Sequence, residues 1–181
     1  MKIKSLIVGG LVATLWAIPA QAQQGTMELG MDAGLVFTMP DIEGLDNTLD
    51  VIAPFQYVRM GFFVTDQFSI EPTASFVRMD FGDDAMTQFA VLASGLYHFT
   101  ADRTQPQFFL QATGGLEYTD FGDVASDTQW FLGGGVGLKM RPLRDFFAVR
   151  LGALYMRAFE SDEFGAANML RGHVGVSVYI N

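Results

Sequence analysis

The segment QFFLQATGGLEY, residues 107–118, carries the pattern that decides the fold. One side of it is apolar from Phe108 to Leu116, and the other side holds Gln111 and Glu117. Strict alternation of this kind predicts a β-strand with two different faces. The segment is longer than the usual strand of about five or six residues. It is long enough to cross a bilayer at a tilt, which takes about 9–11 residues.

Seven further stretches alternate in the same way, and clusters of Asp, Gly and Pro separate them. The connections are short at 65–67, 100–106 and 142–145 and longer on the opposite side, as in barrels with short periplasmic turns. The expected strands are Met27–Phe37, Val51–Val64, Phe68–Met79, Thr87–Phe99, Gln107–Tyr118, Gln129–Arg141, Phe146–Arg157 and Leu170–Ile180.

The second expected strand has an ambiguous register. If Arg59 faces inward, Tyr57 and Gly61 must do so too, because successive side chains point to opposite faces. Phe55 would then also face inward, unless a bulge near Pro54 resets the register.

The composition of the two faces indicates which one meets lipid. The polar faces hold mostly Gly, Ser and a few charged residues, which makes a poor water-facing surface but a suitable packed lumen. The apolar faces carry large side chains along their full length. We therefore expect an all-β, eight-stranded antiparallel up-and-down transmembrane β-barrel. A soluble sandwich or lipocalin-like barrel is the alternative.

Aromatic residues bracket the expected turns, as interface anchors do in membrane barrels. At the short-turn end they include Phe62, Phe63, Phe68, Phe108 and Phe109. We expect them to form one of two aromatic belts.

Residues 1–22 have the parts of a secretory signal peptide. Lys2 and Lys4 precede an apolar run, and Ala20-Gln21-Ala22 is a small-x-small cleavage site. We expect cleavage after Ala22, leaving the barrel at residues 23–181. An uncleaved anchor is the alternative, but the apolar run is short of the roughly 20 residues that span a bilayer. Export combined with a closed barrel predicts the bacterial outer membrane.

Charge and cysteine content exclude several classes of function. The formal net charge is −9, and nucleic-acid binding needs a basic face. The chain has no cysteine, which excludes disulfide scaffolds, Cys-ligated metal sites and a cysteine nucleophile. No cofactor motif is present, and we predict no catalytic, cofactor-binding or metal site on a strand.

Three segments resemble one known family. They are GFFVTDQFSI at 61–70, the Gly-rich FLGGGVG at 131–137, and the alternating end of the last strand, Val174 to Ile180. The chain is similar there to the outer membrane protein beta-barrel domain family, the OmpA/OmpX-like small eight-stranded barrels. It ends in Asn181, where an aromatic residue is usual. The resemblance implies fold and location, with membrane lipid, lipopolysaccharide and the barrel-assembly machinery as partners.

Four acidic and five basic residues fall on inward faces. A buried charge is tolerated only when it is paired and hydrogen-bonded, so we expect a structural ion-pair network in the lumen. We further expect a contact between Asp32 and Arg171, whose strands adjoin where the barrel closes. The expected lumen charges are Glu28, Asp32, Arg59, Glu71, Glu117, Lys139, Arg141, Arg150 and Arg171.

The long connections hold most of the 20 acidic residues. Asp80-Phe81-Gly82-Asp83 recurs at 120–123, and residues 161–165 echo it. Asp and Gly favour turns, which explains the repeat without a ligand. A divalent cation such as Ca²⁺ at these loops is the alternative.

An enzymatic role is not expected, because His98 and His173 lack a Ser two residues away on the same strand face. The sequence therefore predicts an outer-membrane barrel with a structural or surface-interaction role through acidic extracellular loops. A narrow channel for ions or small solutes is the first alternative, and a lipid-modifying enzyme is the second.

Overall fold

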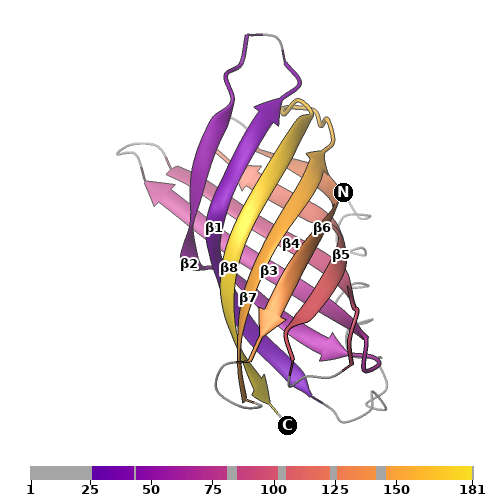
Figure 1. Cartoon of the computed structure of the whole chain (residues 1–181). Coiled ribbons are helices and arrows are strands. Elements are labelled where there is room, and N and C mark those ends of the chain that lie inside the picture. Colours follow the sequence, from indigo (N-terminus) through magenta and orange to yellow (C-terminus); the bar gives the residue numbers. More distant parts are fainter. Residues whose placement is uncertain are drawn as a thin grey trace, which may run out of the picture.

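The computed structural model describes residues 26–42, 44–80, 85–101, 105–122, 126–141 and 146–180. Its strands form one closed antiparallel barrel in the order β1 to β8, and β8 pairs with β1 (Figure 1). The predicted fold is confirmed. The strands are β1 (Met27–Pro40), β2 (Thr48–Phe63), β3 (Phe68–Asp80), β4 (Ala85–His98), β5 (Gln107–Asp120), β6 (Ser126–Met140), β7 (Phe147–Ala158) and β8 (Ala167–Ile180).

The expected signal peptide and its cleavage site lie outside the described residues. Within those residues, no helix is long and apolar enough to cross a membrane.

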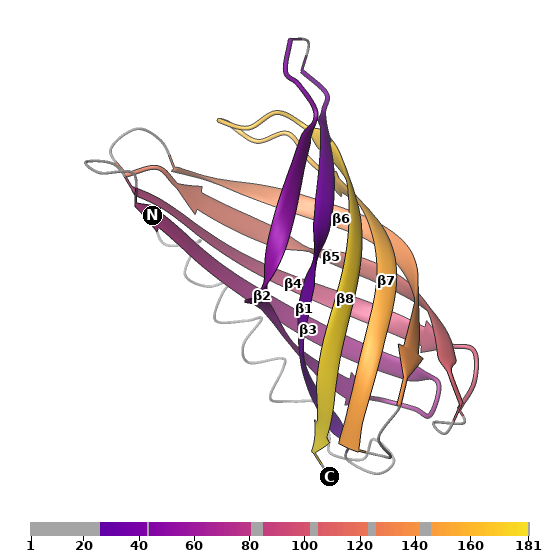
Figure 2. The same cartoon turned by 60° about the vertical axis from the view of Figure 1, so that its left-hand side comes forward.

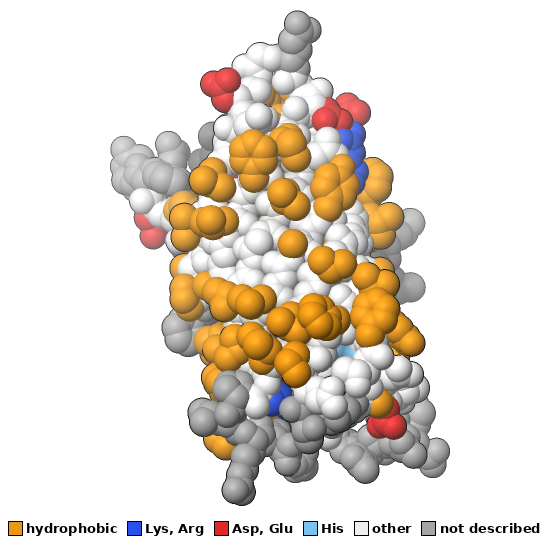
Figure 3. All heavy atoms as spheres, in the orientation of Figure 1, with side chains coloured by type: hydrophobic (Ala, Val, Ile, Leu, Met, Phe, Trp, Pro, Cys, Tyr) orange, Lys and Arg blue, Asp and Glu red, His pale blue; other side chains and the backbone are white. Residues whose placement is uncertain are grey.

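The apolar faces of the strands point outward from the barrel. Leu110 is 47% exposed and Val176 is 40% exposed, whereas Glu28 and Arg59 are buried inside. Hydrophobic side chains cover much of the barrel face in Figure 3, and acidic side chains gather at its upper end. A soluble barrel would show the opposite orientation, so that alternative is wrong.

Most strands run further toward the long-loop end than the alternation predicted. The β1–β8 ladder continues to Pro40 opposite Ala167, three residues beyond the expected end of β1 at Phe37. Backbone pairing does not require alternating side chains. The strands therefore stay hydrogen-bonded beyond the end of their apolar faces.

A bulge in β2 resolves the register of that strand. Tyr57 lies opposite Asp32, but Ile52 lies opposite Gly34, so residues 53–56 of β2 face a much shorter stretch of β1. Arg59 is buried and Val58 is exposed on one side of this bulge, and Ile52 is buried on the other side. The bulge near Pro54 therefore resets which face points inward, as the second of the two sequence interpretations held.

The same bulge opens a fork in the barrel wall. The β2–β3 ladder ends at Tyr57 opposite Ser75, whereas β1–β2 and β3–β4 pairing continues to the outer ends of those strands. Both views show β1 and β2 rising together while β3 and β4 lean away from them (Figures 1 and 2). A bulge bends its strand, so residues 48–56 follow β1 and leave residues 76–80 of β3 without a β2 partner.

Part of the expected aromatic belt lies inside the barrel. Phe63 is 2% exposed and Phe109 is 1% exposed, and both rings pack against His98 in the lumen. Phe68 and Phe108 are exposed as expected. The prediction was wrong for Phe63 and Phe109, because proximity to a turn does not say which face a residue occupies.

Gly137 on β6 makes room for one of these inward rings. A Cβ at this position would collide with the Phe109 ring and with the backbone of Leu151. We predict that Gly137→Ala lowers the free energy of unfolding by about 1–3 kcal/mol, the usual cost of overpacking. Urea unfolding in lipid vesicles, followed by Trp130 fluorescence, measures this.

The matched control is Gly172→Ala on β8, where an added Cβ meets no atom within 4 Å. It should leave the unfolding midpoint unchanged or raise it slightly, because Ala restricts the unfolded chain more than Gly. Equal stability of the two variants would contradict the close packing of Gly137.

Candidate functional site

A network of buried ion pairs fills the middle of the barrel. Arg59 donates from Nη1 to Glu28 Oε1 at 2.7 Å and from Nε to both Asp32 carboxylate oxygens at 3.3 Å. On the other side of Glu28, Lys139 Nζ donates to Oε2, also at 2.7 Å. These side chains are at most 7% exposed. The network thus joins β1, β2 and β6 across the lumen.

Glu71 on β3 extends the network to β7. Arg150 Nη1 donates to Glu71 Oε2 at 2.5 Å, and Lys139 Nζ lies 3.5 Å from Glu71 Oε1. Arg150 Nη2 donates to Gln111 Oε1 at 2.6 Å and Arg59 Nη2 donates to Ser177 Oγ at 2.8 Å, while Arg150 Nε has no partner among the described residues. Three cations therefore face three carboxylates. Neutral side chains accept additional hydrogen bonds from the arginines, and such hydrogen bonding is needed when charges are buried.

Glycines opposite the network explain the small residues on the polar faces. A Cβ at Gly30 would overlap the guanidinium of Arg59, and one at Gly175 would overlap the carboxylate of Asp32. Eight strands leave a lumen only wide enough for side chains to fill. Charged side chains such as Arg59 and Asp32 fit into this lumen because a glycine lies opposite the charged end of each.

Aromatic and apolar side chains close the lumen on the short-turn side of the network. Lys139 lies over the Phe63 ring at 5.5 Å, and Arg150 lies over the Phe109 ring at 4.6 Å. Leu96 and His98 are fully buried beside them. A positive charge against an aromatic face is favourable, so this layer both seals the barrel and stabilises the cations above it.

Not all of the predicted lumen charges join the network. Arg141 lies just after β6, with its Cζ 4.1 Å from the centre of the Tyr179 ring. Glu117 is half-buried in the outer part and accepts a hydrogen bond from Gln88 Nε2 at 2.7 Å. Arg171 also lies outside the network. The six remaining predicted lumen charges form the network: Glu28, Asp32, Arg59, Glu71, Lys139 and Arg150.

The expected contact between Asp32 and Arg171 is not formed. Asp32 lies opposite Gly175 on β8, whereas Arg171 lies opposite Val36, further toward the outer end. Arg59 takes the Asp32 carboxylate, and Arg171 packs over the Tyr57 ring with its Cζ at 4.2 Å. The prediction was wrong because the heights of residues on adjoining strands depend on their register, which alternation does not fix.

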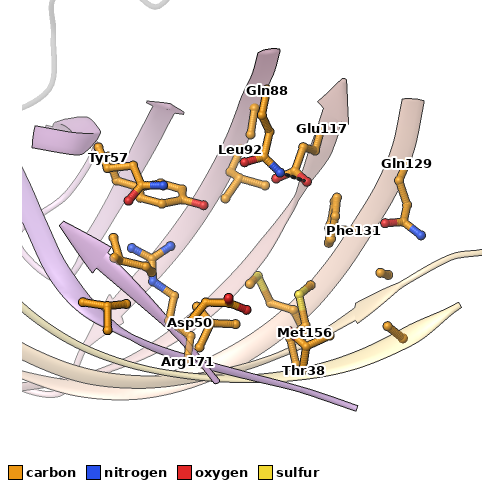
Figure 4. A pocket seen from close by; sticks show the side chains of 18 of the residues that line it. Thr38, Asp50, Tyr57, Gln88, Leu92, Glu117, Gln129, Phe131, Met156 and Arg171 are labelled. Carbon is orange, nitrogen blue, oxygen red and sulfur yellow. Dashed lines mark hydrogen bonds between the residues drawn. The ribbon is translucent and has the colours of Figure 1, made fainter. Parts of the chain in front are cut away.

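A cavity of about 450 Å³ occupies the outer half of the barrel (Figure 4). Tyr57 and Arg171 lie on one side of it, and Phe131 and Met156 lie on another. Gln88 and Glu117 are hydrogen-bonded to each other on its wall. Sequence reasoning missed this cavity, since its lining combines residues from strands far apart in the chain.

A histidine–serine pair also went unpredicted. His98 Nε2 on β4 lies 3.2 Å from Ser69 Oγ on the neighbouring β3, and neither residue is exposed. Among the described residues, Nδ1 of His98 has no hydrogen-bond partner. A nucleophile with its base needs both an orienting group and substrate access, so the pair is a buried polar contact.

The repeated acidic motif forms turns at the outer end. Gly122 has a φ of 66° and donates its N–H to Asp120 Oδ1 at 2.9 Å, which closes the turn. Phe121 and Phe164, the aromatic residues of two copies of the motif, are in ring contact. Asp83 and Asp123 lie outside the described residues. Over the described ranges, no group of three or more acidic or histidine side chains could hold a metal ion.

Removing one carboxylate from the network should destabilise the folded barrel. We predict that Glu28→Gln lowers the free energy of unfolding by about 3–5 kcal/mol, because Arg59 and Lys139 both lose a buried charged acceptor. Urea titration of the barrel in vesicles measures the change.

The control for this variant is Asp80→Asn, since Asp80 and Arg78 form an ion pair in which both side chains are more than half exposed. Its effect should stay below about 1 kcal/mol. A loss of the same size in both variants would show that the lumen network does not stabilise the fold more than a surface pair does.

Comparisons with known proteins agree with this architecture. At 16% sequence identity, the Neisserial surface protein A (NspA) superposes with a TM-score of 0.64, over 86% of this chain and 99% of its own. The N-terminal β-barrel domain of Pseudomonas aeruginosa OprF superposes with a TM-score of 0.51 at 14% identity, over 87% of this chain and 98% of that domain.

These identities are low, so the two likenesses show the fold alone. No curated protein matches the sequence. The profile of the family described as "Outer membrane protein beta-barrel domain" matches residues 10–178, nearly the whole chain. The protein therefore belongs to the outer membrane protein beta-barrel domain family.

Proposed function

We propose that this barrel is a non-conducting component of the bacterial outer membrane that acts through its outer end. The buried ion-pair network carries the proposal. Arg59, Lys139 and Arg150 cross the lumen to Glu28 and Glu71, and all five side chains are at most 2% exposed. Ions would have to break several charge-assisted hydrogen bonds to pass, which opposes a channel role.

Export is part of the same proposal. A signal peptide cleaved after Ala22 would deliver the chain to the barrel-assembly machinery. N-terminal sequencing of the protein recovered from outer membranes checks this, and a mature chain that begins at Gln23 is the expected result.

A planar lipid bilayer tests whether the lumen conducts. We expect no steady current from the folded mature barrel at neutral pH, because a passing ion would have to separate the buried ion pairs of Arg59, Lys139 and Arg150. A larger porin in the same bilayer serves as the positive control. Reproducible open-channel steps from this barrel would overturn the proposal and favour the channel alternative.

The outer end offers an acidic surface for interaction. Asp46, Glu160 and Asp162 are exposed there, on the β1–β2 and β7–β8 connections. Clustered carboxylates attract cations, and divalent cations can bridge them to other anionic groups. We propose that these residues contact the phosphate groups of lipopolysaccharide through divalent cations.

Neutralising these residues tests the role of the outer end. We expect Mg²⁺ to raise the melting temperature of the unmodified barrel in lipopolysaccharide-containing vesicles, and the triple variant Asp46→Asn, Glu160→Gln, Asp162→Asn should lose most of that rise. Asp66→Asn, an exposed position in the β2–β3 turn at the opposite end, is the matched control. If the triple variant and the control keep the same Mg²⁺-dependent rise, the acidic outer end has no such role.

A further inference from the structure

Arg171 is an unpartnered cation facing the outer cavity. Its side chain is only 5% exposed, and its Nε is buried without a hydrogen-bond partner. Within the part of the chain that the structure describes, its one close contact is the face of Tyr57. The other buried cations of the network all meet carboxylates. A guanidinium has five N–H donors, so this site lacks an acceptor.

Each of the two carboxylates on the cavity wall accepts a hydrogen bond from a neighbouring side chain. Glu117 accepts from Gln88 at 2.7 Å, and Asp50 accepts from the Thr48 hydroxyl at 3.2 Å. Asp50 is exposed and stands level with Arg171, since both lie opposite Val36, but no ion pair joins these two described residues across the intervening strand. Arg171 therefore lines the cavity with an Nε donor that has no partner among the described residues, and an anion is the ligand that a guanidinium takes.

Part of the remaining cavity wall is apolar and adaptable, and Thr38, Gln56 and Gln129 are its other polar members. Met79, Met86, Met156 and Met169 line it, together with the buried ring of Phe131. Methionine is flexible and polarisable and suits surfaces that accept chains of varied shape. A volume of about 450 Å³ lies in the lower part of the range of roughly 300–1,000 Å³ for small-molecule sites. That size suits one hydrocarbon chain better than a whole two-chain lipid.

The cavity reaches the fork between β2 and β3. Val51 and Gln56 on β2 and Met79 on β3 border both. The edges of the fork carry exposed apolar side chains, with Val51 75% exposed and Phe76 63% exposed. Unpaired strand edges are tolerated in a membrane protein only where they border a cavity or the polar interface. The fork thus gives an amphiphile in the membrane a lateral route to the cavity.

We propose that the outer cavity is a binding site for a single-chain amphiphile with an anionic head group. The head group accepts hydrogen bonds from Arg171 beside Tyr57, and the chain lies along the methionine-lined wall. This site is independent of the acidic outer end, so either proposal can fail without the other.

Photolabelling tests the site in the folded mature barrel in vesicles. Hexadecanoic acid that carries a diazirine in its chain should label peptides containing Met79, Met86, Met156 or Met169. We expect unlabelled hexadecanoate to compete at least tenfold better than hexadecanol, which has the same chain and no charge. Hexadecyl phosphate in a parallel arm shows whether a phosphate or a carboxylate head group is preferred.

Substitution of the cation tests the role of Arg171. Arg171→Met should reduce the cavity labelling at least tenfold, and Arg171→Lys should retain part of it because it keeps the charge. Arg78→Met, which removes an exposed arginine of the outer rim, is the matched control and should label as the unmodified chain does. Heat-dependent gel mobility verifies that each variant is folded.

Two results would overturn the proposal. One is labelling confined to lipid-facing positions such as Leu110 and Val176, which would mean contact with the surrounding membrane only. The other is equal competition by hexadecanol and hexadecanoate in the unmodified barrel, which would exclude recognition of the anionic head. The second result does not depend on whether the Arg171 variants fold.

Discussion

The pairing of charges inside an apolar shell is the constraint on which this structure depends. The outward faces must be apolar because they meet lipid, so the charged side chains in the inner half of the barrel are directed into a narrow lumen. A lone buried charge in this inner half would be costly. The chain meets this requirement with Glu28, Glu71 and Asp32 set against Arg59, Lys139 and Arg150, drawn from five different strands. The network is a consequence of the fold as well as a support for it.

The same barrel has two different interiors. Its inner half is filled largely by ion pairs and the rings of Phe63 and Phe109. Its outer half holds a cavity, and the wall beside that cavity divides where the β2–β3 ladder stops. The bulge at residues 53–56 separates the two regimes, because it turns the outer part of β2 toward β1 and away from β3. A rigid, closed base and an accessible outer half are thus built into one sheet.

Individual residues show what local pattern could and could not predict. Alternation identified the inward side of Glu28, Lys139 and Arg150 from sequence alone, because period two fixes the face of a residue once one neighbour is known. Nearness to a turn, used in place of alternation, misplaced Phe63 and Phe109 in an outward-facing aromatic belt. Sequence reasoning also paired Asp32 with Arg171, whereas the β1–β8 register puts them at different heights and gives Asp32 to Arg59.

By itself, the sequence determined the number of strands, the direction of the apolar face and the class of membrane barrel, since these follow from period-two alternation and strand length. Only the tertiary structure decided which charges meet, where the wall forks and what lines the outer cavity. Those features depend on register and on the closure of β8 against β1. The closure joins residues more than a hundred positions apart in the chain, and the register depends on how neighbouring strands pair; period-two alternation encodes neither.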